Sequence, residues 1–221
     1  SAVAQHVNAN AMPSEHTCIA VRGYYSNVKG LSDKIEIHFV DDFLPGYFWI
    51  FPLENGQCNV GLGMVAKEMQ AKNLNLVEGL KRILSHSRFA ERFSDAIELS
   101  PIKGWTLPFG SNRRKLSFDG ALLVGDAAAL VDPLTGEGIG NAMLSASLAA
   151  DAAFEAIHKN DFSREQLEIY EKNVWDALGP ELETSYSMQK LARHRKLLNL
   201  FFKKAQKSPR VAAYLSDMLI S

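Results

Sequence analysis

The segment from Gly120 to Gly140 constrains the fold of this chain more than any other. It reads GALLVGDAAALVDPLTGEGIG: a short apolar strand over 121–124, a Gly125-Asp126 turn, then a proline and alternating glycines ahead of a helical pattern. Asp126 thus stands at the carboxyl end of a strand, the edge where open sheets bind ligands, and its carboxylate suits sugar hydroxyls. The alternative is that Asp126 caps the following turn, an ordinary role for aspartate there.

The loop after this turn favours a flat ligand that carries negative charge. Gly136, Gly138 and Gly140 let the backbone come close to such a ligand, and the free N–H groups of the following helix favour an anion. A dinucleotide-binding fold, however, normally opens with G-x-G-x-x-G between a strand and a helix, and no glycines here have that spacing. We therefore expect this chain to be the later part of a larger enzyme.

Short segments rich in β-branched and aromatic residues, separated by turn residues, predict a meander of strands. They are 17–27, 34–42, 46–52 and 57–65. Apolar periodicity predicts a helix over 71–86, and strand composition returns over 96–107, where Pro101 predicts an edge position. From Gly136 onward the pattern is helical, with breaks expected at Gly179-Pro180 and Ser208-Pro209.

Asn55-Gly56 predicts a two-residue hairpin turn, which needs positive φ at both positions. The register expected from it pairs Phe51 with Val60, Ile50 with Gly61, Trp49 with Leu62 and Phe48 with Gly63. One face would then carry Tyr47, Trp49, Phe51, Val60, Leu62 and Met64, and the other Phe48, Ile50 and the two glycines. Because both faces are apolar, each must be covered by helices, another domain or an apolar ligand. The glycines mark either a close ligand or aromatic cover.

Composition places the chain among globular proteins: of 221 residues, 47% are hydrophobic and 22% charged. No stretch of about 18 apolar residues and no signal peptide is present, so we expect a soluble, cytoplasmic protein. Cys18 and Cys58 lie far apart without ligand spacing, which predicts reduced core thiols and no metal site.

Basic residues gather in the last segment, 189–221, which carries eight lysines and arginines against one aspartate. Such a tail either caps the protein or docks on an anionic membrane surface through the leucines and phenylalanines between its charges. No basic and aromatic recognition motif accompanies it, so nucleic acid is not an expected partner.

Two motifs in order resemble one protein family. Gly125-Asp126, Asp132-Pro133 and Gly136-Glu137-Gly138-Ile139 resemble the second FAD motif of the geranylgeranyl reductase and aromatic hydroxylase superfamily of flavoproteins. Residues 45–52 (PGYFWIFP) and 59–63 (NVGLG) are similar to the Y-x-W-x-F-P and N-V-G-x-G pattern of its geranylgeranyl reductase branch. The resemblance spans roughly residues 1–160.

The resemblance implies an α+β fold. An antiparallel substrate-binding sheet with covering helices would occupy 1–108, the last strand and following helices of a truncated FAD/NAD(P)-binding domain 109–160, and a helical region 161–221. Without the first glycine motif the adenine half of FAD has no site, so we expect this chain alone to bind FAD weakly or not at all. Its exposed apolar edges predict self-association.

The same resemblance implies an FAD-dependent oxidoreductase that reduces isolated carbon–carbon double bonds of a polyprenyl substrate. NAD(P)H or another reductant would donate the electrons. Implied cofactor-binding residues are Gly125, Asp126, Pro133, Thr135, Gly136, Gly138 and Ile139. Implied substrate-binding residues are Tyr47, Trp49, Phe51, Gly61 and Gly63. No catalytic acid stands out in the sequence.

Two other function classes remain open. An FAD monooxygenase or halogenase has a similar aromatic and proline-containing strand, and a halogenase would place a working lysine near its tunnel, with Lys67 or Lys103 as candidates. A non-catalytic lipid-binding or interaction module is the third class. The sequence leaves the substrate, the electron donor, the proton donor and the oligomeric state undetermined.

Overall fold

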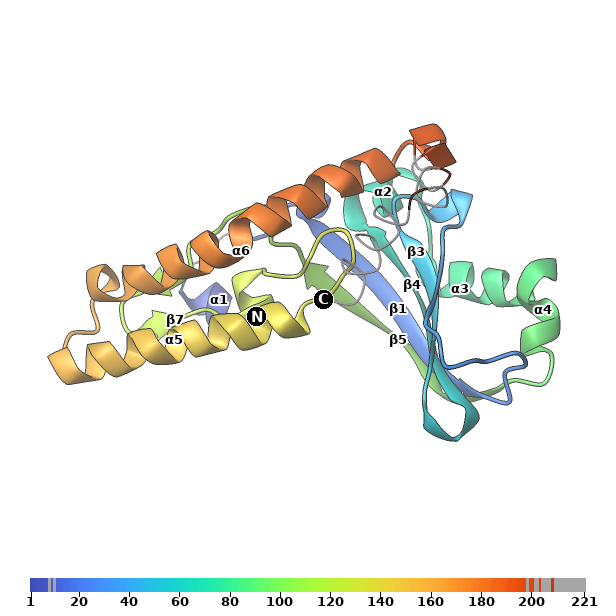
Figure 1. Ribbon diagram of the computed structural model, residues 1–221, viewed down its shortest axis with the longest axis horizontal. Coiled ribbons are helices and arrows are strands. Elements are labelled where there is room, and N and C mark those ends of the chain that lie inside the picture. The colour runs from blue at the N-terminus through green and yellow to red at the C-terminus, as the bar shows by residue number, and fades with distance from the viewer. Residues whose placement is uncertain (8, 10, 198, 201–202, 204–207, 209–221) are drawn as a thin grey trace. The chain divides into compact units, whose positions relative to one another are not determined.

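The computed structural model describes residues 1–7, 9, 11–197, 199–200, 203 and 208. The chain divides into two compact units, one of Thr17–Thr106 and one of Ser1–His16 with Leu107–Ser221 (Figure 1). The class is α+β, with an antiparallel sheet and helices, as predicted.

The units differ from the predicted domain limits. The first 16 residues, expected with the substrate sheet, belong to the unit that holds the C-terminal helices. One reason is backbone pairing, since the Phe109 amide donates to the His16 carbonyl at 2.9 Å. Contacts do not separate 109–160 from 161–221, because α5 (Ile139–Lys159) packs along α6 (Arg164–Ala192).

The unit of Thr17–Thr106, here the sheet unit, is built on a five-stranded sheet in the order β2-β3-β4-β1-β5. The strands are β1 (Thr17–Ser26), β2 (Glu36–His38), β3 (Tyr47–Pro52), β4 (Gln57–Val65) and β5 (Ile97–Pro108). β2 and β5 form the edges, so the edge position that Pro101 predicted is confirmed. An edge strand tolerates proline because its outer N–H groups have no ladder partner to lose.

The hairpin register predicted for β3 and β4 is wrong by one residue. Trp49 pairs with Gly61, Phe48 with Leu62 and Ile50 with Val60. The turn takes three residues instead of two, because Glu54–Gly56 form a short 3-10 turn, η3, closed by the Leu53 amide on the Gln57 carbonyl at 2.8 Å. Positive φ at Asn55 (58°) and Gly56 (68°) is as expected.

This shift exchanges the two faces of the hairpin, since side chains alternate along a strand. Phe48, Ile50, Val60 and Leu62 all point to one side and are fully buried. The other side carries Tyr47, Trp49 and Phe51 beside the two glycines, so the predicted grouping of aromatic residues with Val60, Leu62 and Met64 is wrong.

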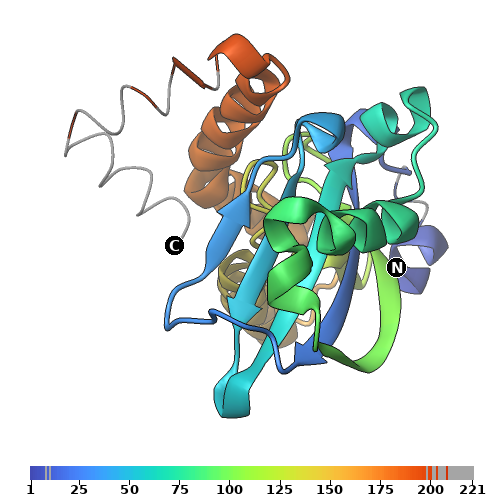
Figure 2. The same cartoon turned by 90° about the vertical axis from the view of Figure 1, so that its right-hand side faces the viewer.

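Three helices pack on the buried side of the sheet: α2 (Ala66–Ala71), α3 (Leu76–Ser85) and α4 (Ser87–Phe93). Figure 2 shows α3 and α4 lying across this face of the sheet. Leu80 and Ile83 of α3 enter the core with Leu62. The helix predicted over 71–86 corresponds to α3 and begins later, because the Asn75 side chain accepts hydrogen bonds from the amides of Val77 and Glu78 and so caps it.

The other unit, here the helical unit, holds the Gly120–Gly140 segment. Its elements are α1 (Ala2–His6), the 3-10 turn η1 (Ser14–His16), β6 (Ser117–Phe118), β7 (Ala121–Leu122), the 3-10 turn η4 (Gly125–Ala128), α5 and α6. The strand predicted over 121–124 is shorter than expected, and it pairs with β6 in a small antiparallel hairpin. Leu116, Leu123, Tyr170 and Val174 are buried together in this unit.

The break predicted at Gly179-Pro180 does not occur, and α6 continues through it. Packing outweighs the lost hydrogen bond, because Leu178 and Leu182 on either side are buried in the core. Gly179 has a different role: a Cβ there would lie 2.6 Å from a guanidinium nitrogen of Arg113. The second predicted break, Ser208-Pro209, lies outside the described residues apart from Ser208.

Candidate functional site: a glycine-rich loop and an aromatic sheet face

Gly125 makes the turn after β7 possible. Its φ is +53°, and a Cβ at this position would lie 3.0 Å from the Cβ of Ala142 in α5. Its amide donates to the Ser145 hydroxyl at 3.1 Å. Glycine therefore lets the start of η4 rest directly on small residues of α5.

Asp126 follows with an exposed side chain. Its Oδ1 lies 3.7 Å from the position that a Cβ on Gly138 would take, so the structure brings these two predicted residues together. Among the residues that the structure describes, nothing donates a hydrogen bond to the Asp126 carboxylate. The Asp126 carboxylate is therefore accessible to hydrogen-bond donors from outside the chain.

The loop from Asp132 to Gly138 is braced by its own side chains. Asp132 is 7% exposed, and its Oδ1 accepts from the amides of Leu134 and Thr135 at 2.8 Å each and from the Thr135 hydroxyl at 3.0 Å. Thr135 Oγ1 in turn accepts from the Glu137 amide at 3.2 Å. These hydrogen bonds hold the shape of the loop, and Thr135 takes part in two of them.

Other predicted residues shape the same loop. Gly136 has a φ of +75°, a conformation that favours glycine. Pro133 is buried, and its carbonyl accepts a hydrogen bond from the Gln189 side chain of α6. Ile139, at the first turn of α5, is 77% exposed. Its apolar side chain and the Asp126 carboxylate are the exposed groups among the seven predicted cofactor residues.

Glu137 corrects the expectation that the whole N-terminus of α5 is open to an anion. Its Oε1 accepts from the Gly140 amide at 2.7 Å. A carboxylate at a helix N-terminus satisfies a free donor and offsets part of the positive end of the helix dipole. An anionic ligand at this terminus must share it with Glu137 or displace that side chain.

The aromatic face of the sheet unit centres on Trp49. Its indole lies flat against Gly61, where a Cβ would come within 2.1 Å of Cζ2. The indole Nε1 donates to Asn59 Oδ1 at 3.0 Å, which holds the ring over Gly61. Of the two interpretations of Gly61, aromatic cover is the one the structure bears out.

The predicted substrate residues form a ladder around this indole. Ring centroids lie 5.8 Å apart between Tyr47 and Trp49 and 6.0 Å apart between Trp49 and Phe51, and all three side chains are half-buried. A Cβ at Gly63 would lie 3.7 Å from the same indole and 3.4 Å from the Cys18 sulfur. The structure thus gathers all five predicted substrate residues on one sheet face.

Sequence reasoning missed the extension of this face onto β5. Ile102 contacts Gly23 on the helix-covered side, so by alternation Ile97, Leu99 and Trp105 lie on the same side as Trp49. Their exposed fractions are 53%, 44% and 72%. The alternation within 97–105 was the available signal. Within its own unit this side of the sheet therefore carries two apolar groups, Trp49 with its aromatic neighbours and the apolar residues of β5. The strand β1 separates them and places Arg22 opposite Gly61.

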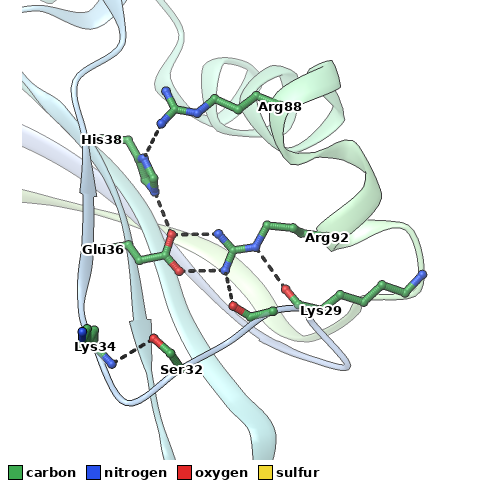
Figure 3. A network of polar contacts seen from close by, with 8 residues as sticks. Lys29, Ser32, Lys34, Glu36, His38, Arg88 and Arg92 are labelled. Atoms are coloured by element: carbon green, nitrogen blue, oxygen red, sulfur yellow. Dashed lines mark hydrogen bonds and ion pairs between the residues drawn. The ribbon is translucent and has the colours of Figure 1, made fainter.

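The densest polar network lies on the opposite side of the sheet (Figure 3). Arg92 of α4 makes a two-pronged ion pair with Glu36 of β2, at 2.8 and 2.7 Å, and donates to the carbonyls of Lys29 and Gly30. His38 contacts Glu36 at 3.0 Å and Arg88 at 3.3 Å. Because arginine can only donate, His38 Nδ1 is the acceptor and Nε2–H points to Glu36.

This network fastens α4 to the edge strand and does not face the aromatic side. Glu36 pairs with Ile50 and His38 with Phe48, which are core residues. Hydrogen bonds from Arg92 hold the pKa of Glu36 below its usual value, and burial lowers the pKa of His38 despite its carboxylate neighbour. Both groups thus favour the state in which Glu36 is ionised and His38 is neutral.

The remaining candidates lie as follows. Cys18 and Cys58 are free thiols, and burial raises the pKa of Cys18 to about 12 and that of Cys58 to about 11, so both stay protonated. Lys67 of α2 and Lys103 of β5 are exposed. Among the described residues, no helix has the length and apolar character that a bilayer span requires.

Comparison with known proteins supports the pattern seen in the residues. Residues 16–100 match the family model of the geranylgeranyl reductase catalytic domain. A digeranylgeranylglycerophospholipid reductase from Methanosarcina mazei is 36% identical over 152 residues, covering 68% of this chain and 36% of the relative. One of the same name from Methanocaldococcus jannaschii is 35% identical over 184 residues, covering 82% of this chain and 44% of the relative. The matched part of this chain therefore spans less than half the length of these relatives.

Solved structures share the fold. A geranylgeranyl bacteriochlorophyll reductase-like protein from Thermoplasma acidophilum superposes with a TM-score of 0.74 at 24% identity, covering 94% of this chain and 56% of that one. The halogenase PltM gives a TM-score of 0.66 at 15% identity, covering 100% of this chain and 49% of the halogenase. Motifs, family model and relatives agree: residues 16–100 are similar to the geranylgeranyl reductase catalytic domain, and the chain is similar to part of the digeranylgeranylglycerophospholipid reductases.

Proposed function

We propose that the protein containing this chain is an FAD-dependent oxidoreductase that saturates isolated carbon–carbon double bonds of a prenyl lipid. The observation that carries the proposal is the aromatic sheet face, in which Trp49 lies against Gly61 and is flanked by Tyr47 and Phe51. Exposed apolar residues of β5 lie on the same side of the sheet. A polyprenyl chain offers no polar group to recognise along its length, so a broad apolar surface suits it. Relatives named digeranylgeranylglycerophospholipid reductases support this substrate class.

The glycine-rich loop fits the flavin end of FAD. Asp126 offers ribityl hydroxyls an exposed carboxylate to which no described residue donates a hydrogen bond. The Pro133–Ile139 loop is braced by Asp132 and carries Ile139 as an exposed apolar contact for a flat ring. When bound and reduced, the flavin supplies the hydride, which the protein complements by positioning the substrate and excluding water. A proton completes the saturated bond, and NAD(P)H or another reductant restores the electron pair.

Product analysis tests this function. The full polypeptide is incubated with chemically reduced FAD and a geranylgeranyl phospholipid, and the lipids are examined by mass spectrometry. The proposal expects gain of one pair of hydrogens for each reduced bond, with no need for oxygen. An oxygen-dependent hydroxylated product or halide incorporation would instead identify a monooxygenase or a halogenase. Bound FAD without turnover of any kind would favour a lipid-binding module.

Peripheral membrane contact through the basic C-terminal segment is part of the proposal, because a lipid substrate resides in a bilayer. Among described residues, Leu191, Leu197 and Leu200 are exposed beside Lys190 and Lys196. Apolar and basic side chains together favour an anionic surface. Co-sedimentation with phosphatidylglycerol vesicles, absent with phosphatidylcholine and reduced by Lys190→Gln with Lys196→Gln, is the expected result. Equal sedimentation with both lipids would refute it.

We also propose that this chain in isolation self-associates and binds FAD weakly. Exposed apolar side chains on β5 and along α5, such as Trp105 (72%), Met143 (70%) and Phe154 (60%), support association. Light scattering coupled to gel filtration, with flavin absorbance of the same peak, tests both parts. A yellow monomer with one flavin per chain would contradict them.

A further inference from the structure

We propose that the helical unit contains a second ligand site, a basic cavity that binds a phosphate group. The cavity has a volume of about 500 Å³ and is lined by Asn112, Arg113, Arg114 and Lys115 on one side and by apolar residues including Met12 and Phe118 on the other. Among the described residues that line it, none is acidic. None of the predicted flavin or substrate residues lines it either, so this site stands independently of the proposed reductase activity.

Arg114 is the residue that requires an anion. Its side chain is half-buried, and its Nε is fully buried with no hydrogen-bond partner among the described residues. Burial also lowers its pKa, and no carboxylate of the described residues forms an ion pair with it. Since a guanidinium stays charged at neutral pH, the protein carries a partly desolvated cation, and an anionic ligand in the cavity would supply its counter-charge.

The neighbours of Arg114 are held in place. Arg113 pairs with Glu183 at 2.8 Å and its guanidinium lies 5.5 Å over the Trp175 ring, in the space that Gly179 leaves open. This fixes the backbone just before Arg114 against α6. The ion pair occupies one nitrogen of Arg113, so the remaining donors of its fork stay available.

The backbone just after Arg114 is fixed as well. Glu171 of α6 accepts from the amides of Leu116 and Ser117 at 2.8 and 3.2 Å, and the Ser117 hydroxyl donates to the Leu167 carbonyl at 2.9 Å. Lys115 places its ammonium 5.0 Å from the centre of the Phe118 ring. Three consecutive cations are thus presented by a segment anchored on both sides, which lowers the entropy lost on binding.

The chemistry points to a phosphate ester with an apolar neighbour. A planar guanidinium donates two parallel hydrogen bonds to phosphate oxygens, and a lysine adds a point charge. The apolar lining suits a group attached to the phosphate more than it suits a bare, fully hydrated ion. Two sources carry this chemistry, a phospholipid headgroup and a soluble phosphate ester, and the experiment separates them.

The test is calorimetric titration of the protein with pyrophosphate and, separately, with dihexanoyl phosphatidate below its micellar concentration. We expect saturable binding that weakens with salt and falls at least about tenfold in Arg114→Ala. Arg164→Ala is the matched control, because Arg164 also has a buried, unpartnered Nε but lies outside the cavity and pairs with Glu168. Its affinity should equal that of the parent protein.

If circular dichroism shows that Arg114→Ala is not folded, a second variant provides the test. Lys115→Gln changes an exposed side chain and should weaken binding by about threefold. Tighter binding of the phosphatidate than of pyrophosphate assigns the site to a lipid headgroup, and the reverse order assigns it to a soluble ester. The proposal is overturned if neither compound binds, or if the parent, Arg114→Ala and Lys115→Gln proteins bind with equal affinity.

Discussion

Gly61→Ala should destabilise the sheet unit through one identifiable collision. The added Cβ would lie 2.1 Å from Trp49 Cζ2 and 2.6 Å from two further ring atoms. Since an ordinary carbon contact is about 3.5 Å, the indole must retreat by roughly 1.4 Å. That movement breaks its 3.0 Å hydrogen bond to Asn59. Overpacking costs about 1–3 kcal/mol and the lost hydrogen bond about 1 kcal/mol, so we expect about 2–4 kcal/mol in total.

A double-mutant cycle isolates this collision. In a Trp49→Ala background the same Gly61→Ala change meets no ring, and it should be neutral or stabilise by up to about 1 kcal/mol by restricting the unfolded chain. Gly104→Ala is the control in the same sheet, because its Cβ would meet Val21 at an ordinary 3.6 Å. It should cost less than about 1 kcal/mol.

Hydrogen exchange of the β3 and β4 amides, measured by mass spectrometry, is the assay. It reports the opening free energy of this unit separately from the helical unit. The reasoning predicts a coupling energy of about 2–4 kcal/mol between positions 49 and 61. An equal cost of Gly61→Ala in both backgrounds, or a cost no larger than that of Gly104→Ala, would refute it.

Three further outcomes follow from contacts described above. Asp126→Asn should weaken FAD binding by the full polypeptide about tenfold, measured by flavin fluorescence. Asp151→Asn, on the exposed side of α5, should leave the affinity unchanged. Equal affinity of the parent protein and both variants would contradict the assigned role. Burial lowers the pKa of His38 from 6.5, so the stability that it contributes is complete above about pH 6.5 and is lost as pH falls through the folded pKa. His38→Asn should reduce this pH dependence of the free energy of unfolding, measured with urea at several pH values. An unchanged pH dependence would argue against this role of His38. Arg92→Ala should lower the free energy of unfolding by about 1–3 kcal/mol in the same assay. Arg82→Ala, which removes a surface ion pair, should lower it by less than about 1 kcal/mol. Similar losses would show that the Arg92 network adds nothing beyond surface charge.

The strand meander and the loop were predictable because their signals are local. Turn residues and alternating apolar residues placed β1, β3 and β4 closely, and Gly125 and Gly136 both adopt the positive φ that glycine permits. The hairpin register failed because the sequence does not reveal whether Glu54 joins the turn, and one extra turn residue exchanges the faces of a strand.

Features that depend on long-range packing could not be predicted from the sequence. The helix through Gly179-Pro180 survives because buried leucines on both sides hold it, and propensity alone predicts a break there. The ion pair of Arg92 with Glu36 joins residues 56 positions apart, and no local pattern announces it. The sequence places Glu137 within a glycine motif and gives no sign that its carboxylate caps α5, the helix at which an anion was expected.

A structure of the full polypeptide with FAD and a prenyl lipid tests the central claim most directly. We predict elongated density for the prenyl chain against Trp49 and its neighbouring apolar strand residues, and the isoalloxazine ring along the Pro133–Ile139 loop with Asp126 bonded to the ribityl chain. A polar, empty surface beside Trp49, with the lipid bound elsewhere or the flavin held away from this loop, would contradict it.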